Sequence, residues 1–160
     1  KLLNGKIPFE VIEEKLIEMR KANTIFFAVD SLNYLVKNGR LSNAAGFVGK
    51  MLKLKPILQV QESGKIVSIE KIRTTRAALQ SITSKVKTFT HGRPYHAYIL
   101  YTGNPKLKSY FIQIIKEDLG LVDLYESPST PVVGAHVGPD VIGIGIFLDH
   151  DSSLPHIEKL

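Results

Sequence analysis

Apolar side chains recur at every third or fourth position in several parts of the chain, which is the spacing of an amphipathic helix. In the first of these parts, Val11, Ile12, Leu16 and Met19 form the apolar stripe. Pro8 marks the start of the first helix, serine, threonine or asparagine residues that can cap a helix mark the starts of the others, and glycine marks two of the ends. The predicted helices are residues 8–22, a short one between Ser31 and Gly39, one after Ser42, one after Thr74 or Thr75, and one from Asn104 to Gly120.

Short runs rich in β-branched and aromatic residues lie between these helices and predict strands. The runs are 24–30, 56–60, 65–70, 95–101, 121–126, 131–135 and 141–148. Gln61-Glu62-Ser63-Gly64 predicts a hairpin turn. Because helices and strands are mixed without strict alternation, the predicted fold class is α/β, with an α+β variant possible. We expect one mixed sheet of about six strands with helices packed against it, in a single domain over residues 1–160.

The last predicted strand, 141–148, differs between its two faces because alternate residues point to opposite sides. Isoleucines and a leucine occupy one side, whereas Gly143 and Gly145 leave the middle of the other side without side chains. Glycine inside a strand often marks close approach by another backbone or a ligand. Two readings follow: a helix packed on that face, which we favour, or room for an elongated apolar ligand.

The segment Gly134-Ala135-His136-Val137-Gly138-Pro139-Asp140 precedes this strand and predicts a tight turn between strands. Small neighbours leave the His136 ring accessible. A neutral imidazole donates one hydrogen bond to a carboxylate, and a protonated one donates two. A loop histidine is more often structural or solvated, so the pattern by itself does not choose between that role and ligand binding.

Composition excludes several classes of protein. The chain has 160 residues and no cysteine, which removes disulfides, thiolate nucleophiles and cysteine metal sites. No apolar run reaches the roughly 18 residues of a transmembrane helix, and the N-terminus does not resemble a signal peptide. The sequence has no P-loop, no nucleophile elbow and no metal-ligand spacing among its histidines. No cofactor is expected.

Positive charge is concentrated in the middle of the chain, where residues 37–87 carry eleven basic and two acidic groups. This stretch is either a solvated basic face or a surface for an acidic or phosphorylated partner. Its only aromatic residue, Phe47, lies on a predicted helix stripe. Single-strand nucleic-acid binders interleave aromatic and basic residues so that bases can stack. No nucleic-acid partner is therefore expected.

Six segments together resemble the DegV family. They are Val29-Asp30-Ser31-Leu32-Asn33-Tyr34-Leu35, Asn38-Gly39-Arg40-Leu41-Ser42, Leu54-Lys55-Pro56-Ile57-Leu58, Gly64-Lys65-Ile66, Glu70-Lys71-Ile72-Arg73 and Gly134-Ala135-His136-Val137-Gly138-Pro139. Each segment is a weak match, but their order and spacing are specific. The resemblance covers only the second half of the family's usual length, so we expect the C-terminal half of a two-domain protein whose N-terminal domain is absent.

The resemblance implies a bacterial, cytoplasmic lipid-binding carrier rather than an enzyme. Family members hold one long-chain fatty acid in a tunnel between two domains and present its carboxylate to a fatty-acid kinase, for phospholipid synthesis. The turn Gly134, Ala135 and His136 would bind the carboxylate. Arg40 and Arg73 would lie on the surface that meets the kinase.

The chain differs from the family at one position near the predicted site, and the sequence also leaves an alternative function open. The family often has glycine where this chain has Asp140, although aspartate tolerates left-handed backbone. An alternative function is an enzyme or enzyme subunit that handles phosphorylated substrates through Arg40, Arg73 and Arg76, since arginine binds phosphate through paired donors. No general base or nucleophile accompanies these arginines in the sequence.

Overall fold

The computed structural model describes residues 8–42, 54–121 and 124–149. Within these ranges the chain forms one six-stranded sheet and five helices. The elements in chain order are α1 (Phe9–Lys21), β1 (Asn23–Ala28), α2 (Asn33–Lys37), β2 (Lys55–Val60), β3 (Ile66–Ile72), α3 (Thr75–Thr90), β4 (Tyr95–Tyr101), α4 (Pro105–Leu119), β5 (Tyr125–Pro128), α5 (Pro131–Val137) and β6 (Ile142–Leu148).

The sheet has the strand order β3-β2-β1-β6-β4-β5. All neighbouring pairs are antiparallel except β4 and β5, which are parallel. The last strand of the chain, β6, therefore lies between β1 and β4, near the centre of the sheet. This mixed α/β sheet confirms the predicted fold class.

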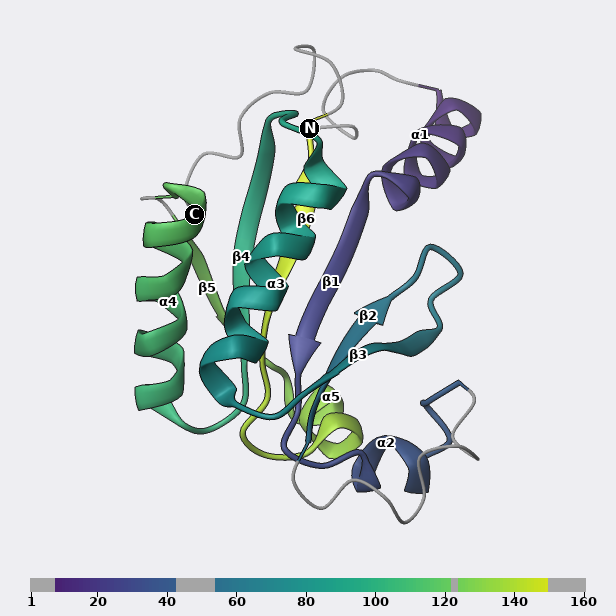
Figure 1. Cartoon of the computed structure of the whole chain (residues 1–160). Helices are drawn as coiled ribbons and strands as arrows, with labels where there is room; N and C mark the ends of the chain where they lie inside the picture. Colours follow the sequence, from purple (N-terminus) through teal and green to yellow (C-terminus); the bar gives the residue numbers. More distant parts are fainter. Residues whose placement is uncertain (1–7, 43–53, 122–123, 150–160) are drawn as a thin grey trace.

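One face of the sheet carries the main core and is covered by α3 and α4 (Figure 1). Leu79, Ile82 and Val86 of α3 are fully buried there, as the helical spacing predicted. Phe111 and Ile115 of α4 are also fully buried. Ile142, Ile144, Ile146 and Leu148 of β6 point toward these helices, which confirms that they share one face. We call this the helix face.

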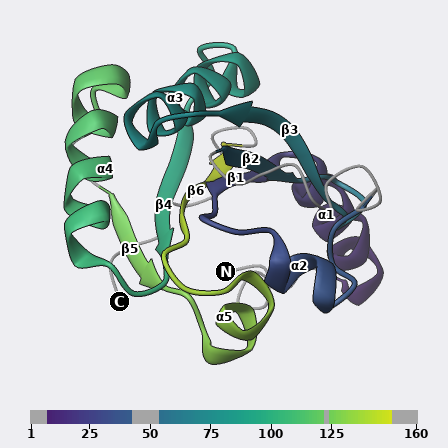
Figure 2. The same cartoon turned by 60° about the horizontal axis from the view of Figure 1, so that its bottom comes forward.

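The opposite face is covered at one end by α2 and α5, which lie side by side in both views (Figures 1 and 2). A second apolar cluster forms there, and it joins Leu35 of α2, Val137 of α5, and Phe27 and Leu58 of the sheet. The rest of this face carries Ile25, Tyr98, Leu100 and Phe147, which are all half-buried. We call this the open face. In the described ranges, the two long helices that cover the sheet, α3 and α4, both lie on the helix face.

Most predicted elements are confirmed, and local signals account for their ends. Thr74 caps α3 by accepting a hydrogen bond from the Ala77 amide at 3.2 Å. Asn104 caps α4 in the same way, and Gly120 ends that helix in the left-handed region. The helix expected after Ser42 lies outside the described residues.

Two strand predictions need correction. Residues 131–135 were expected to form a strand but belong to α5, because Thr130 caps a helix there and Pro131 suits its first position. His136 consequently lies in the last turn of a helix, and the turn between elements follows it at Gly138–Asp140. The strand expected at 121–126 is instead β5, at Tyr125–Pro128.

Candidate ligand-binding site

The site is built on α5, which carries Gly134, Ala135 and His136. The Thr130 hydroxyl accepts a hydrogen bond from the Val133 amide at 3.4 Å and starts the helix. Gly138 ends it with φ 86° and ψ −174°, a conformation that essentially only glycine adopts. Asp140 follows with φ 57°, so this aspartate does take the left-handed backbone expected of it.

Contacts from α2 fix one side of α5. The Asn38 side-chain amide donates to the Ala135 carbonyl at 3.1 Å and to the Tyr34 carbonyl at 2.8 Å. The Tyr34 ring lies against Gly138, where an added Cβ would stand 2.5 Å from Cδ2 of the ring. The segments around Tyr34 and His136 are about one hundred residues apart in sequence and adjacent in space. The sequence singled out both segments but did not predict this contact.

The sheet also fixes the end of α5 through Thr102, the residue after β4. Its hydroxyl donates to the Gly138 carbonyl at 2.9 Å and accepts from the Val141 amide at 3.0 Å. The Thr102 backbone amide also donates to the Val141 carbonyl at 3.0 Å. The short helix that carries His136 is therefore held at a defined position relative to the start of β6.

His136 has an unused polar atom at this position. Its side chain is half-buried, and Nδ1 is buried without a hydrogen-bond partner among the described residues. Buried polar atoms are normally paired, and an unpaired one costs about 1–3 kcal/mol. Gly134 is next to open space, since an added Cβ there would meet no described atom within 4 Å. The Nδ1 atom is the group that a ligand with a polar head would use, because it is able to form a hydrogen bond and has no partner among the described residues.

The glycines of β6 lie on the open face, and among the described residues the atoms nearest to them come from the neighbouring strands rather than from a helix. The atoms nearest to a Cβ at Gly143 belong to Phe27 and to the Phe26 carbonyl of the neighbouring strand β1. A Cβ at Gly145 would overlap the ring of Tyr98 from β4, standing 2.5 Å from both Cε atoms and closer still to Cζ. The ring of Tyr98 therefore lies over Gly145, whereas Gly143 lies against the backbone and Cβ of β1.

Within the described ranges 37–42 and 54–87, the basic residues of the middle of the chain do not form one charged cluster. Lys55 pairs with Asp30, and Lys85 of α3 pairs with Glu70 of β3 at 2.8 Å. Arg40 and Arg73 are both exposed, but they lie near opposite ends of β3. Leu41 bridges to Ile66 at the first residue of that strand, whereas Arg73 follows its last residue. A seven-residue strand spans about 20 Å, so one phosphate group cannot contact both positions.

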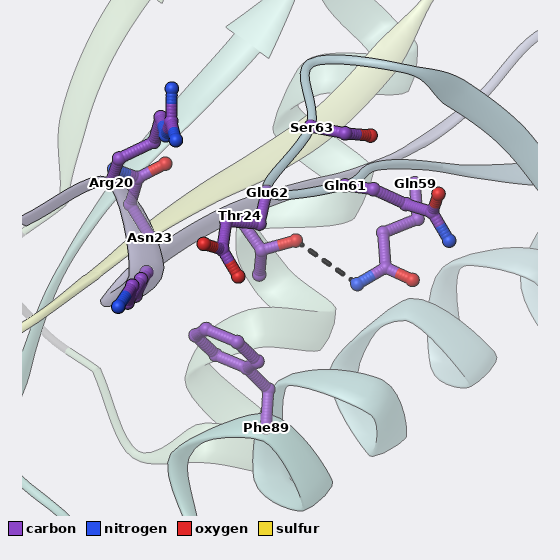
Figure 3. Close-up of a pocket in the computed structure, with 9 residues that line it drawn as sticks. Arg20, Asn23, Thr24, Gln59, Gln61, Glu62, Ser63 and Phe89 are labelled. Carbon is purple, nitrogen blue, oxygen red and sulfur yellow. Dashed lines mark hydrogen bonds between the residues drawn. The ribbon is translucent and has the colours of Figure 1, made fainter. Parts of the chain in front are cut away.

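A cleft of about 650 Å³ lies on the helix face, away from His136 (Figure 3). It lies between the end of α1, the β2–β3 turn and Phe89 of α3. Gln59 donates to the Thr24 hydroxyl at 3.2 Å across its wall. The remaining lining residues are mainly charged or amide-bearing: Arg20, Lys21, Asn23, Gln61, Glu62 and Ser63. This polar lining does not suit a hydrocarbon chain.

The described ranges also bear on membrane spans and metal sites. No helix there is long and apolar enough to cross a membrane. No group of three or more histidine, aspartate or glutamate side chains in residues 8–42, 54–121 and 124–149 is placed to hold a metal ion.

Comparison with known proteins identifies the family. Residues 1–149 match the sequence profile of a family described as "Uncharacterised protein, DegV family". The chain belongs to the DegV family. It is 34% identical over 142 residues to the protein DegV of Bacillus subtilis, covering 88% of this chain and 50% of that protein. It is 33% identical over 138 residues to a DegV domain-containing protein of Streptococcus pyogenes serotype M1, a match that covers 86% of this chain and 49% of that protein.

Solved DegV structures share this fold. A fatty acid binding DegV family protein from Streptococcus agalactiae superposes with a TM-score of 0.85 at 30% identity, covering 93% of this chain and 53% of that one. DegV from Bacillus subtilis, described as a fatty acid binding protein, superposes with a TM-score of 0.74 at 32% identity, covering 92% and 52%. The chain thus spans about half the length of the relatives it matches.

Proposed function

We propose that this chain is the C-terminal half of a fatty-acid carrier. In this proposal the acyl chain lies on the open face of the sheet, and the carboxylate accepts a hydrogen bond from His136. The missing half of the protein covers the open face and closes the tunnel. Burial of each CH₂ group contributes about 0.8 kcal/mol, so a long acyl chain gains ample affinity once the tunnel is closed.

The Nδ1 atom of His136, which is buried and has no hydrogen-bond partner among the described residues, carries this proposal. Val137, the next residue of the same helix, packs with Phe27 and Leu58 of the open face, so the helix that carries this atom adjoins that face. Two DegV relatives of similar fold, from Streptococcus agalactiae and Bacillus subtilis, are described as fatty acid binding. A carboxylate at His136 would satisfy a polar atom that otherwise costs free energy.

We further propose that the carrier acts without catalysing a reaction itself. It presents the fatty-acid carboxylate to a fatty-acid kinase, and Arg40 and Arg73 lie on the surface that the kinase contacts. Their separation along β3 suits a broad protein surface better than a single phosphorylated substrate. Such a carrier would work in the bacterial cytoplasm, a reducing compartment with which a chain free of cysteine is compatible.

Lipid extraction tests the carrier function directly. The complete protein, purified without added lipid, should release one long-chain fatty acid per molecule into an organic extract, as measured by mass spectrometry. The same extraction from an unrelated protein purified in parallel is the control. A complete protein that releases no fatty acid, and that binds none when fatty acid is added, would overturn the proposal.

A further inference from the structure

We propose that Tyr98, seated on Gly145, forms the floor of the acyl-chain site and determines which acyl chains fit there. This inference rests on the proposed carrier function and assigns its selectivity to one pair of residues. Tyr98 is on the open face, in register with Gly145 of β6 on one side and Tyr125 of β5 on the other.

The position of Tyr98 along the sheet places it under the acyl chain rather than under the headgroup. Thr102, the residue after β4, contacts the end of α5 by a hydrogen bond to the Gly138 carbonyl. Tyr98 lies four residues before Thr102, which is about 13 Å along the strand. A long acyl chain that begins at His136 and follows the open face passes over Tyr98 part-way along its length.

Gly145 gives the floor an adjustable depth that Gly143 does not have. The nearest neighbours of a Cβ at Gly143 include the Phe26 carbonyl and the Phe27 Cα, which belong to the backbone of β1. The three nearest neighbours of a Cβ at Gly145 are all ring atoms of Tyr98. A ring can rotate away from an obstacle and a backbone in the middle of a sheet cannot. The height of the open face can therefore change at Gly145.

The surroundings of Tyr98 are suited to hydrocarbon. Three apolar residues are half-buried on the same face: Ile25 of β1, Leu100 of β4 and Phe147 of β6. Burial raises the pKa of the Tyr98 phenol, so the ring stays neutral at physiological pH. One side of the ring rests on Gly145, and the half-buried state of the residue leaves surface for a ligand to contact.

Substitutions on either side of this contact should change selectivity in opposite directions. Gly145→Ala lifts the ring and makes the site shallower, whereas Tyr98→Ala deepens it. The measured quantity is the ratio of dissociation constants for a saturated and a cis-monounsaturated fatty acid of equal length, bound to the complete protein. We expect each variant to shift this ratio by about tenfold, the scale for one methylene group in a hydrophobic pocket. Tyr98→Phe, which keeps the ring, should leave the ratio unchanged.

The double variant Tyr98→Ala/Gly145→Ala and the single variant Gly143→Ala complete the test. With the ring removed, alanine at 145 meets no obstacle, so the double variant should return toward the wild-type ratio. Gly143→Ala clashes with backbone and should lower the melting temperature without a change in ratio. If Gly145→Ala does not fold, Tyr98→Ala and Tyr98→Phe still decide the matter. A ratio equal to wild type in the Tyr98→Ala variant would overturn the inference while leaving the carrier function intact; absence of binding by the wild type would overturn both.

Discussion

The ring of Tyr34 lies directly on Gly138, the residue that ends the helix carrying His136. Two features of Gly138 make this contact possible. Its backbone has φ 86° and ψ −174°, and it has no side chain where the ring stands. The contact ties α2 to α5, and it fixes the helix together with the hydrogen bonds from the Asn38 amide and the Thr102 hydroxyl. The position of His136 thus depends on a residue about one hundred positions earlier in the chain.

Gly138→Ala should destabilise the protein strongly. Alanine is strained in this region of backbone space by about 1–3 kcal/mol, and its Cβ would overlap the Tyr34 ring, which adds a further cost of similar size. We expect a total loss of about 2–6 kcal/mol in the free energy of unfolding, measured by urea denaturation.

The matched control for this change is Gly120→Ala. Gly120 also has positive φ, 67°, but an added Cβ there meets no described atom within 4 Å. The control should lose only the left-handed backbone cost of about 1–2 kcal/mol. Equal losses in the two variants would mean that the Tyr34 contact contributes nothing.

His136→Ala should weaken fatty-acid binding to the complete protein. Loss of a hydrogen bond to a charged carboxylate costs about 1–3 kcal/mol, which corresponds to a fall in affinity of about 5- to 150-fold. Titration with a fluorescent fatty-acid analogue measures this change. The control is His91→Asn, at the exposed left-handed end of α3, where asparagine tolerates the backbone. An affinity unchanged by His136→Ala removes this residue from the site.

Gly134→Ala should separate stability from binding. The position is inside α5, and an added Cβ meets no described atom within 4 Å. Alanine is favoured over glycine within a helix by up to about 1 kcal/mol, so the melting temperature should rise. If the open space admits the fatty-acid headgroup, the same methyl group should lower the affinity. A variant that is more stable and binds equally well would show that the headgroup lies elsewhere.

Glu70→Gln should reduce stability at neutral pH and lose this effect in acid. Hydrogen bonds from Lys85, first, and from Ser81 hold the pKa of the Glu70 carboxyl below its ordinary value of 4.5. A lowered folded-state pKa stabilises the protein above pH 4.5, and this contribution disappears as the pH falls through the folded value. Because the side chain is 39% exposed, the effect at pH 7 should not exceed about 1 kcal/mol.

Melting temperatures measured across pH check this expectation. The difference between wild type and Glu70→Gln should shrink below pH 4.5. Glu62→Gln, in the exposed β2–β3 turn, is the control, because no described residue forms an ion pair with that carboxylate. A difference that stays constant down to acid pH would assign the effect to packing rather than to charge.

Local signals in the sequence were enough to predict most elements. Thr74, Asn104 and Gly120 act where the sequence placed them, because a helix cap depends on a few adjacent residues. The alternation along β6 also predicted correctly which residues would face the helices. The family followed from short segments whose order is preserved along the chain.

Residues 131–135 show where local patterns mislead. Two valines within five residues favour a strand by propensity, but Thr130 and Pro131 supply a helix start that outweighs them. The same error affected His136. It was expected in a loop between two strands, and it lies in α5.

The sequence alone determined the fold class, the family and the candidate residue His136, because apolar periodicity, caps and turn residues act over a few positions. Tertiary structure alone decided what lies beside them. It placed Tyr98 over Gly145, set Tyr34 against Gly138, and separated Arg40 from Arg73 along β3. These outcomes depend on strand order and register, which are settled by packing among segments far apart in the chain and are not encoded in any one of them.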